Sequence, residues 1–151
     1  MEIIVNEWLL DYMRPNADEE KTKMAQFVNT VVKKCDKIVI RRPSRFTEKF
    51  YTYMKIYGYD TRFKERFSKL NKLLFHNPDK TIIVDDADLG ILPIEIEGKV
   101  PPKDKYLVEL AYFSKDKIII TTDNPLKEKL QDGQNIKVYL FEEFIQNYFS
   151  S

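Results

Sequence analysis

Short apolar runs alternate with amphipathic stretches along the chain, and this alternation limits the possible fold more than any other feature of the sequence. Five runs are predicted to be strands, over residues 2–5, 37–42, 80–86, 116–122 and 135–140. Strands buried on both faces are apolar throughout, whereas strands with one wet face alternate. The expected fold class is therefore α/β: a three-layer α/β/α arrangement with a central, mainly parallel sheet.

Amphipathic segments separate these runs and are predicted to be helices. They cover residues 7–13, 18–35, 45–57, 61–74, 103–115, 124–132 and 141–149. Ser44 is a suitable N-cap for the third of them, and Gly58 is a natural end for it. Residues 87–102 are rich in Pro and Gly, so they indicate a loop with at most a short extended piece at 94–97.

Length and composition favour one cytosolic domain over residues 1–151. The 25 basic and 24 acidic residues nearly cancel, so net charge excludes neither a nucleic-acid binder nor an enzyme. Cys35 is the single cysteine, which excludes a disulfide framework and favours a reducing compartment. The opening residues resemble neither a signal peptide nor a membrane span, so we expect a cytoplasmic protein without membrane contact.

Polar residues follow the ends of several predicted strands. In a parallel sheet with right-handed crossovers, the carboxyl ends of the strands and the starts of the following helices share one edge. The residues that this geometry brings to that edge are Asn6, Glu7, Glu48, Asp104 and Asp123. Close carboxylates repel one another, and a hard divalent cation such as Mg²⁺ is the usual partner for them. Such a site is typical of metal-dependent phosphodiester hydrolysis.

Residues 101–130 carry a more specific pattern. Asp104 opens a helix, Ala111 is a small residue late in it, and a strand then ends in Thr121–Asp123, with Asn124 adjoining. This pattern resembles the C-terminal half of PIN domains, and the last strand and helix also resemble that family. The order of elements agrees along the whole chain, while the motif is specific only from about residue 101 onward.

The resemblance implies a function. PIN domains are Mg²⁺- or Mn²⁺-dependent ribonucleases and flap nucleases, and many stand-alone members of this size are toxins of toxin–antitoxin pairs. The chain is therefore expected to be a metal-dependent endoribonuclease acting on single-stranded RNA, with Mg²⁺ or Mn²⁺ as cofactor. A small antitoxin protein is an expected partner.

The resemblance also implies roles for individual residues and shows one departure from the family. By position, Glu48 is the family's middle acid, beside the two matched aspartates. Where the family has its first Asp, this sequence has Asn6, whose amide brings no charge to a metal site. Glu7 is the expected replacement, and Asp11 is a weaker one. The alternative is a catalytically degenerate PIN-like protein that binds RNA or a protein without cleaving.

Each candidate also has a local structural interpretation. Asp123 alone is typical of a strand end or a helix cap, Asp104 of a first-turn acid, and Asn6 of a helix cap. Glu48 is equally typical of an exposed helical position, and Glu65 is the substitute for it. Only the combination with the PIN pattern favours chemistry.

Several further residues are candidates for contacts with substrate or partners. Arg41, Arg42 and Arg45 follow the second strand and suit phosphate contacts, or form a solvated turn. Thr122 and Asn124 flank Asp123 and are further candidates for substrate contact. The tyrosines that either stack on RNA bases or pack in the core are Tyr51, Tyr53, Tyr57 and Tyr59. Apolar residues around Trp8, Leu9 and Tyr12 leave a homodimer open.

Overall fold

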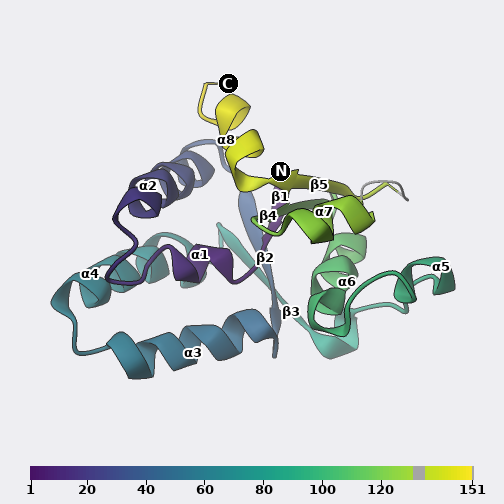
Figure 1. Ribbon diagram of the computed structural model, residues 1–151, viewed down its shortest axis with the longest axis horizontal. Coiled ribbons are helices and arrows are strands. Elements are labelled where there is room, and N and C mark those ends of the chain that lie inside the picture. The colour runs from purple at the N-terminus through teal and green to yellow at the C-terminus, as the bar shows by residue number, and fades with distance from the viewer. Residues whose placement is uncertain (131–134, 151) are drawn as a thin grey trace.

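The sheet of the computed structural model, which describes residues 1–130 and 135–150, has five parallel strands in the order β3-β2-β1-β4-β5 (Figure 1). The strands are β1 (Glu2–Val5), β2 (Lys37–Arg42), β3 (Thr81–Asp85), β4 (Ile118–Thr121) and β5 (Lys137–Leu140). Helices cover both faces of this sheet. The predicted three-layer α/β/α architecture is confirmed.

The central strands are buried because their side chains are apolar on both faces. Ile3, Ile4 and Ile119 have no exposed surface, and Ile4 lies opposite Ile119 in the parallel register of β1 and β4. β3 lies at one edge of the sheet and is partly exposed, with Ile83 49% accessible. Sheet position therefore accounts for the difference between the strands.

The helices divide between the two faces of the sheet. In Figure 1, α1 to α4 lie on the left of the sheet, and α6 and α7 lie on its right. The helices on the left are α1 (Trp8–Asp11), α2 (Asp18–Lys33), α3 (Arg45–Tyr57) and α4 (Thr61–Leu70), which continues as η1 (Asn71–Phe75). The remaining elements are η2 (Asp86–Asp88), α5 (Ile94–Glu97), η3 (Pro102–Asp104), α6 (Lys105–Phe113), α7 (Asn124–Leu130) and α8 (Phe141–Tyr148).

An aromatic cluster joins α1, α2 and α8 above the sheet. Trp8 packs against Phe27 and Phe141, with ring centroids 5.9 and 4.4 Å away. The Trp8 indole Nε1 donates a hydrogen bond to the Ile120 carbonyl at 2.9 Å. Trp8 is 3% exposed and Leu9 is fully buried, so these side chains belong to the core and cannot form a dimer surface.

The structure corrects some predicted boundaries. Residues 94–97 were expected to form at most a short extended piece. They instead form the single helical turn α5, which Pro93 precedes and Gly98 ends. The π-helical turn η1 extends the α4 segment to Phe75. Residues 131 and 132 of the predicted 124–132 helix lie outside the described residues. Within the described ranges, no helix combines the length and apolarity that crossing a membrane requires.

The strand order fixes where a site is expected. From β1 the chain crosses to β2 and β3 on one side, and β4 and β5 lie on the other side of β1. Sheets of this kind bind ligands beyond the carboxyl ends of the strands where the order reverses. Here that point is the end of β1 and β4, which is followed by the starts of α1 and α7.

Candidate functional site

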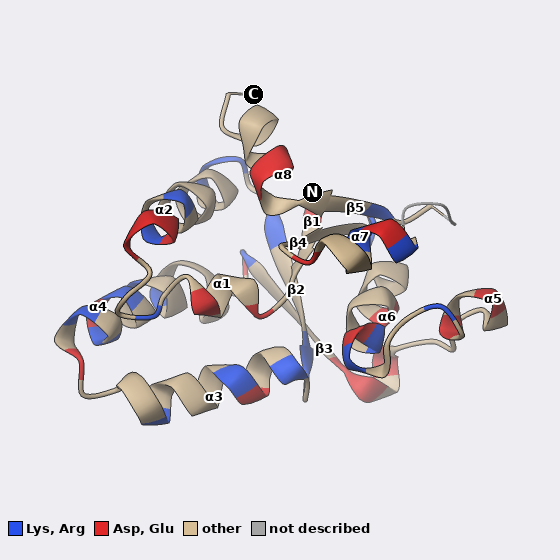
Figure 2. Cartoon of the chain, viewed as in Figure 1, with Lys and Arg blue, Asp and Glu red and all other residues tan. Residues whose placement is uncertain are grey.

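Three carboxylates converge beyond the ends of β1 and β4. Glu7 follows β1, Asp123 follows β4, and Asp104 stands at the start of α6. Figure 2 shows acidic residues in the segments that lead into α1 and α7. Three segments that are far apart in the sequence therefore meet at the point where the strand order reverses.

Asp104 is the most buried of these acids, with 8% of its surface exposed. Its side chain makes no capping hydrogen bond to α6. Burial raises the pKa of the Asp104 carboxyl, Lys103 opposes this shift, and the charges of Asp123 and Glu7 raise the pKa further. The free energy of placing a charge here is thus increased by both desolvation and repulsion.

Glu7 is the acid with the clearest counter-charge. The guanidinium of Arg45, at the start of α3, lies 3.5 Å from the Glu7 carboxylate. Arg45 is 56% exposed, so solvent weakens this pair, while the Glu7 side chain is only 19% exposed. The pair therefore leaves much of the acidic charge at the site uncompensated.

Tyr106 is a buried neighbour of these acids that was not among the residues predicted from the sequence. Its hydroxyl is buried beside the Glu7 carboxylate, which is the acceptor close to it. Burial, followed by the nearby charge of Glu7, raises the pKa of the Tyr106 phenol well above its ordinary value. The phenol therefore stays protonated and keeps a donor beside Glu7. In the sequence, Tyr106 occupies a position of a predicted helix that is typical of core packing, so nothing there indicated a place beside the acids.

Asp123 has a structural role as well as a place among the acids. Its Oδ1 accepts a hydrogen bond from the Leu126 amide at 3.1 Å, which caps the first turn of α7. Its own amide donates to Thr121 Oγ1 at 3.0 Å. The capping bond fixes the carboxylate in one orientation.

Asn6 is engaged on both sides of its amide. Its Oδ1 accepts from the Trp8 amide at 3.3 Å, and its Nδ2 donates to Thr121 Oγ1 at 3.2 Å. Asn6 is 8% exposed and Thr121 is fully buried. The side chain therefore ties the end of β1 to the end of β4, and its carbonyl oxygen is already in use.

The other predicted acids lie in different surroundings. Glu48 is exposed on α3, one turn beyond Arg45. Asp11 pairs with Lys49 at 2.7 Å and accepts a hydrogen bond from the Tyr53 hydroxyl at 2.5 Å, so it ties α1 to α3. Glu65, the substitute for Glu48, is exposed on α4. The acids whose charges act on one another are therefore Glu7, Asp104 and Asp123, and the predicted role of Glu48 stays a prediction.

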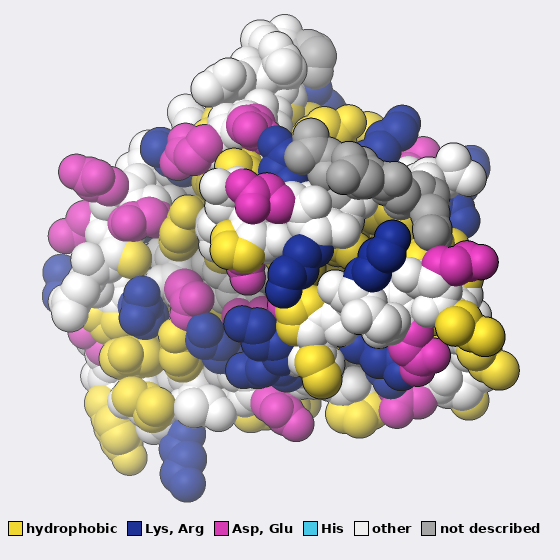
Figure 3. Space-filling model, turned by 45° about the vertical axis from the view of Figure 1, so that its right-hand side comes forward, with side chains coloured by type: hydrophobic (Ala, Val, Ile, Leu, Met, Phe, Trp, Pro, Cys, Tyr) yellow, Lys and Arg dark blue, Asp and Glu magenta, His cyan; other side chains and the backbone are white. Residues whose placement is uncertain are grey.

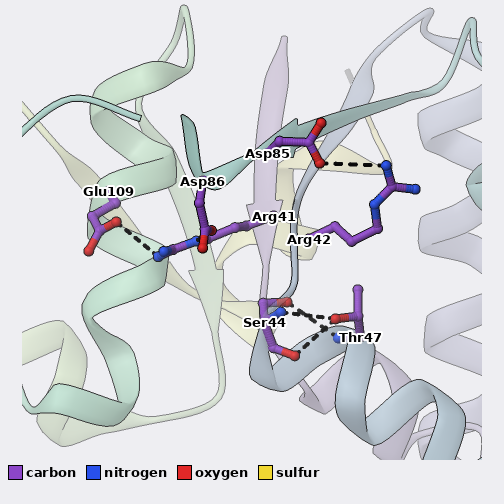
Figure 4. A network of polar contacts seen from close by, with 7 residues as sticks. All are labelled: Arg41, Arg42, Ser44, Thr47, Asp85, Asp86 and Glu109. Atoms are coloured by element: carbon purple, nitrogen blue, oxygen red, sulfur yellow. Dashed lines mark hydrogen bonds and ion pairs between the residues drawn. The ribbon is translucent and has the colours of Figure 1, made fainter. Parts of the chain in front are cut away.

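The two arginines at the end of β2 are already paired with carboxylates. Figure 4 shows Arg41 reaching Asp86 and Glu109, at 2.7 and 2.9 Å, on the α6 side of the sheet. Arg42 points toward the other side and lies 3.5 Å from Asp85. Arg41 is 19% exposed, so its charge is held in a local network, whereas Arg42 is accessible.

The exposed polar residues around the acids are those suited to contact a ligand. Thr122 and Asn124 are exposed on either side of Asp123, and Arg45 is exposed opposite Glu7. In Figure 3, basic side chains gather next to acidic ones in the middle of this face. Basic groups at the rim of an acidic site suit an anionic ligand that brings a cation with it.

No three His, Cys, Asp or Glu side chains within residues 1–130 and 135–150 are already grouped as ligands for a metal ion. Mg²⁺ is usually bound through one or two carboxylates and keeps several waters. The chemistry of Asp104 and Asp123 fits that requirement, because one is buried without a capping bond and the other lies close enough to raise its pKa.

Comparison of the chain with protein-family models, with curated proteins and with solved structures finds no match.

Proposed function

We propose that the protein is a metal-dependent endoribonuclease whose site lies at the ends of β1 and β4. The observation that carries this proposal is the convergence of Asp104, Asp123 and Glu7, two of which raise the pKa of the third. Acids that repel one another in a partly buried site favour a bound cation.

Asp104 and Asp123 would hold Mg²⁺ or Mn²⁺, with Glu7 as the third acid. A divalent cation bound there would supply positive charge against the charge that develops on a phosphate, and would lower the pKa of water. The cap on α7 holds Asp123 in place, and the burial of Asp104 keeps competing water away. Arg45 is placed to exchange Glu7 for a substrate phosphate.

Single-stranded RNA is the substrate that the PIN resemblance implies, and the exposed Arg42 and Arg45 beside the acids suit a phosphate backbone. The same resemblance favours the toxin of a toxin–antitoxin pair. Expression in growing cells should then arrest growth, and Asp123→Asn should relieve the arrest.

The direct test is cleavage of single-stranded RNA in Mn²⁺ and in Mg²⁺ by the wild-type protein and by Asp123→Asn. We expect cleavage by the wild type only, and none in EDTA. Asp79→Asn is the matched control, because Asp79 is an exposed acid just before β3, at the opposite end of the strands from the proposed site. Equal cleavage by wild type and Asp123→Asn would contradict the proposal.

One observation favours a second function, in which the protein binds RNA or a protein without cleaving. Asn6 stands where the PIN pattern has an acid, and both ends of its amide are hydrogen-bonded. The site then has fewer free ligands than the family pattern. RNA binding that survives in Asp123→Asn, with no cleavage by the wild type, would support this function instead.

A further inference from the structure

A hollow lies at the β3 edge of the sheet, on the α3 side. It has a volume of about 300 Å³, and its lining includes Ile40 and Ile83 of the sheet, Phe46 and Tyr51 of α3, and Phe75. This volume is at the lower end of the range for small-molecule pockets, which suits a single ring system rather than a long chain.

The wall of the hollow is aromatic. Phe75 packs edge-on against Phe46 and Phe50, with ring centroids 5.5 and 5.7 Å apart. Tyr51 packs edge-on against Phe50, at 5.5 Å, yet remains 68% exposed. The hollow thus combines a fixed aromatic wall with an accessible aromatic ring, which is the arrangement on which flat rings stack.

The opening of the hollow carries positive and polar groups. Arg42 lines it and is 60% exposed, held only by a 3.5 Å contact with the equally exposed Asp85. His76, the one histidine of the sequence, also lines it. A surface pair of this kind contributes little free energy, so a phosphate can replace Asp85 at small cost.

A capping box fixes the hollow relative to the acidic site. Ser44 and Thr47 exchange hydrogen bonds at the start of α3, with Ser44 N to Thr47 Oγ1 at 2.9 Å (Figure 4). The turn they close holds Arg42 toward the hollow and Arg45 toward Glu7. A strand crossing the first turn of α3 would therefore meet both arginines.

We propose that this hollow binds one base of a single-stranded nucleic acid, with Arg42 on the adjoining phosphate. The inference rests on the proposed function for the kind of ligand, but it assigns a separate subsite that needs neither metal nor the acids. Tyr51 provides the stacking surface, and the apolar floor of Ile40 and Ile83 excludes water from the base. The subsite would place the strand over α3 and toward Asp104.

The test measures binding in EDTA, where no cleavage occurs, by fluorescence anisotropy of a short labelled single-stranded oligoribonucleotide. Tyr51→Ala should weaken binding about tenfold, as expected for one lost stacking contact. Tyr59→Ala is the matched control, because Tyr59 is 95% exposed just beyond the far end of α3. It should bind as the wild type does. Equal affinities for the two variants would overturn the proposal.

A second arm uses an abasic oligomer of the same length, which keeps every phosphate. The wild type should bind it about tenfold more weakly than the normal oligomer, and Tyr51→Ala should cause no further loss. A full further loss would overturn base binding. If Ile83→Lys changes the oligomeric state and leaves RNA affinity unchanged, the hollow is a protein interface and the proposal also fails.

The two proposals fail separately. In EDTA, Tyr51→Ala should weaken binding about tenfold in the Asp123→Asn background as it does in the wild type, because the subsite excludes the acids. Absent cleavage together with a Tyr51-dependent affinity would overturn the nuclease and leave the subsite standing. Asp123-dependent cleavage with no effect of Tyr51→Ala would do the reverse.

Discussion

The carboxyl ends of β2 and β3 and those of β1 and β4 lie along one edge of the sheet. The two pairs of strand ends differ in whether the charges near them are paired with opposite charges. At β2 and β3, Arg41 is held by Asp86 and Glu109 at 2.7 and 2.9 Å. At β1 and β4, Asp104 is buried next to Asp123 and Glu7, and its pKa is raised. At β2 and β3, which we call the paired end, opposite charges neutralise one another. At β1 and β4, which we call the acidic end, carboxylates outnumber the basic groups paired with them.

The comparison shows that a cluster of charges does not by itself indicate a ligand site. Arg41 lies near the end of β2, where a substrate-binding arginine could lie, but its charge is already paired with Asp86 and Glu109. Asp104 would be an ordinary first-turn acid in the sequence, but it lacks a cap bond and lies among like charges. The compensation of charge, and not its amount, distinguishes the two ends.

The largest expected effect is on the rate of RNA cleavage, compared between a variant at the β1 and β4 ends and one at the β2 and β3 ends. Asp104→Asn should lower the rate of RNA cleavage in Mn²⁺ at least about 100-fold, since it removes a ligand of the cation whose positive charge would offset that of the transition state. Asp86→Asn should leave the rate within about twofold, because Asp86 serves Arg41. Similar losses in both variants would erase the distinction between the ends.

The next effect concerns stability at the paired end. Arg41→Ala leaves Glu109, whose side chain is 13% exposed, without its partner. We expect the free energy of unfolding to fall by about 2 kcal/mol, and Tm by about 4–8 °C. Arg42→Ala should cost less than about 0.5 kcal/mol, because its pair is exposed. Thermal unfolding followed by circular dichroism compares the two.

The third prediction concerns a variant with one more carboxylate at the ends of β1 and β4. Asn6→Asp restores the residue of the PIN pattern and should tighten Mn²⁺ binding about tenfold, because charge count sets affinity for hard cations. Without metal, its Tm should fall, since the Nδ2 bond to Thr121 is lost and another carboxylate joins the acids. Calorimetric titration measures the first effect, and unchanged Mn²⁺ affinity would argue against a metal site here.

The smallest effect is a gain in stability. Because its pKa is raised, the Asp104 carboxyl in its ionised form destabilises the fold at neutral pH, and this cost disappears as pH falls toward the ordinary value of 3.8. In EDTA at pH 7, Asp104→Asn should therefore unfold a few degrees above the wild type, with the difference shrinking at lower pH. A lower Tm for the variant at pH 7 would show that the acid is compensated after all.

Much of the fold follows from local sequence. The runs at 2–5 and 37–42 become β1 and β2 with the predicted bounds, since uninterrupted β-branched residues suit a buried strand. Ser44 and Gly58 delimit α3 as predicted, because capping is a local interaction. Residues 94–97 were predicted wrongly, since alternating Ile and Glu fits an extended piece as well as a single helical turn.

The site could be predicted only in part. The sequence by itself determined that Asp104, at the start of a helix, and Asp123, after the end of a strand, would lie at one edge, because parallel topology brings such positions together. Only the tertiary structure decided that Arg41 forms an ion pair with Glu109, that Asn6 joins β1 to β4, and that Tyr106 lies beside Glu7. Ion pairing and burial depend on which side chains from distant parts of the sequence come into contact. The local sequence around each residue does not determine those contacts.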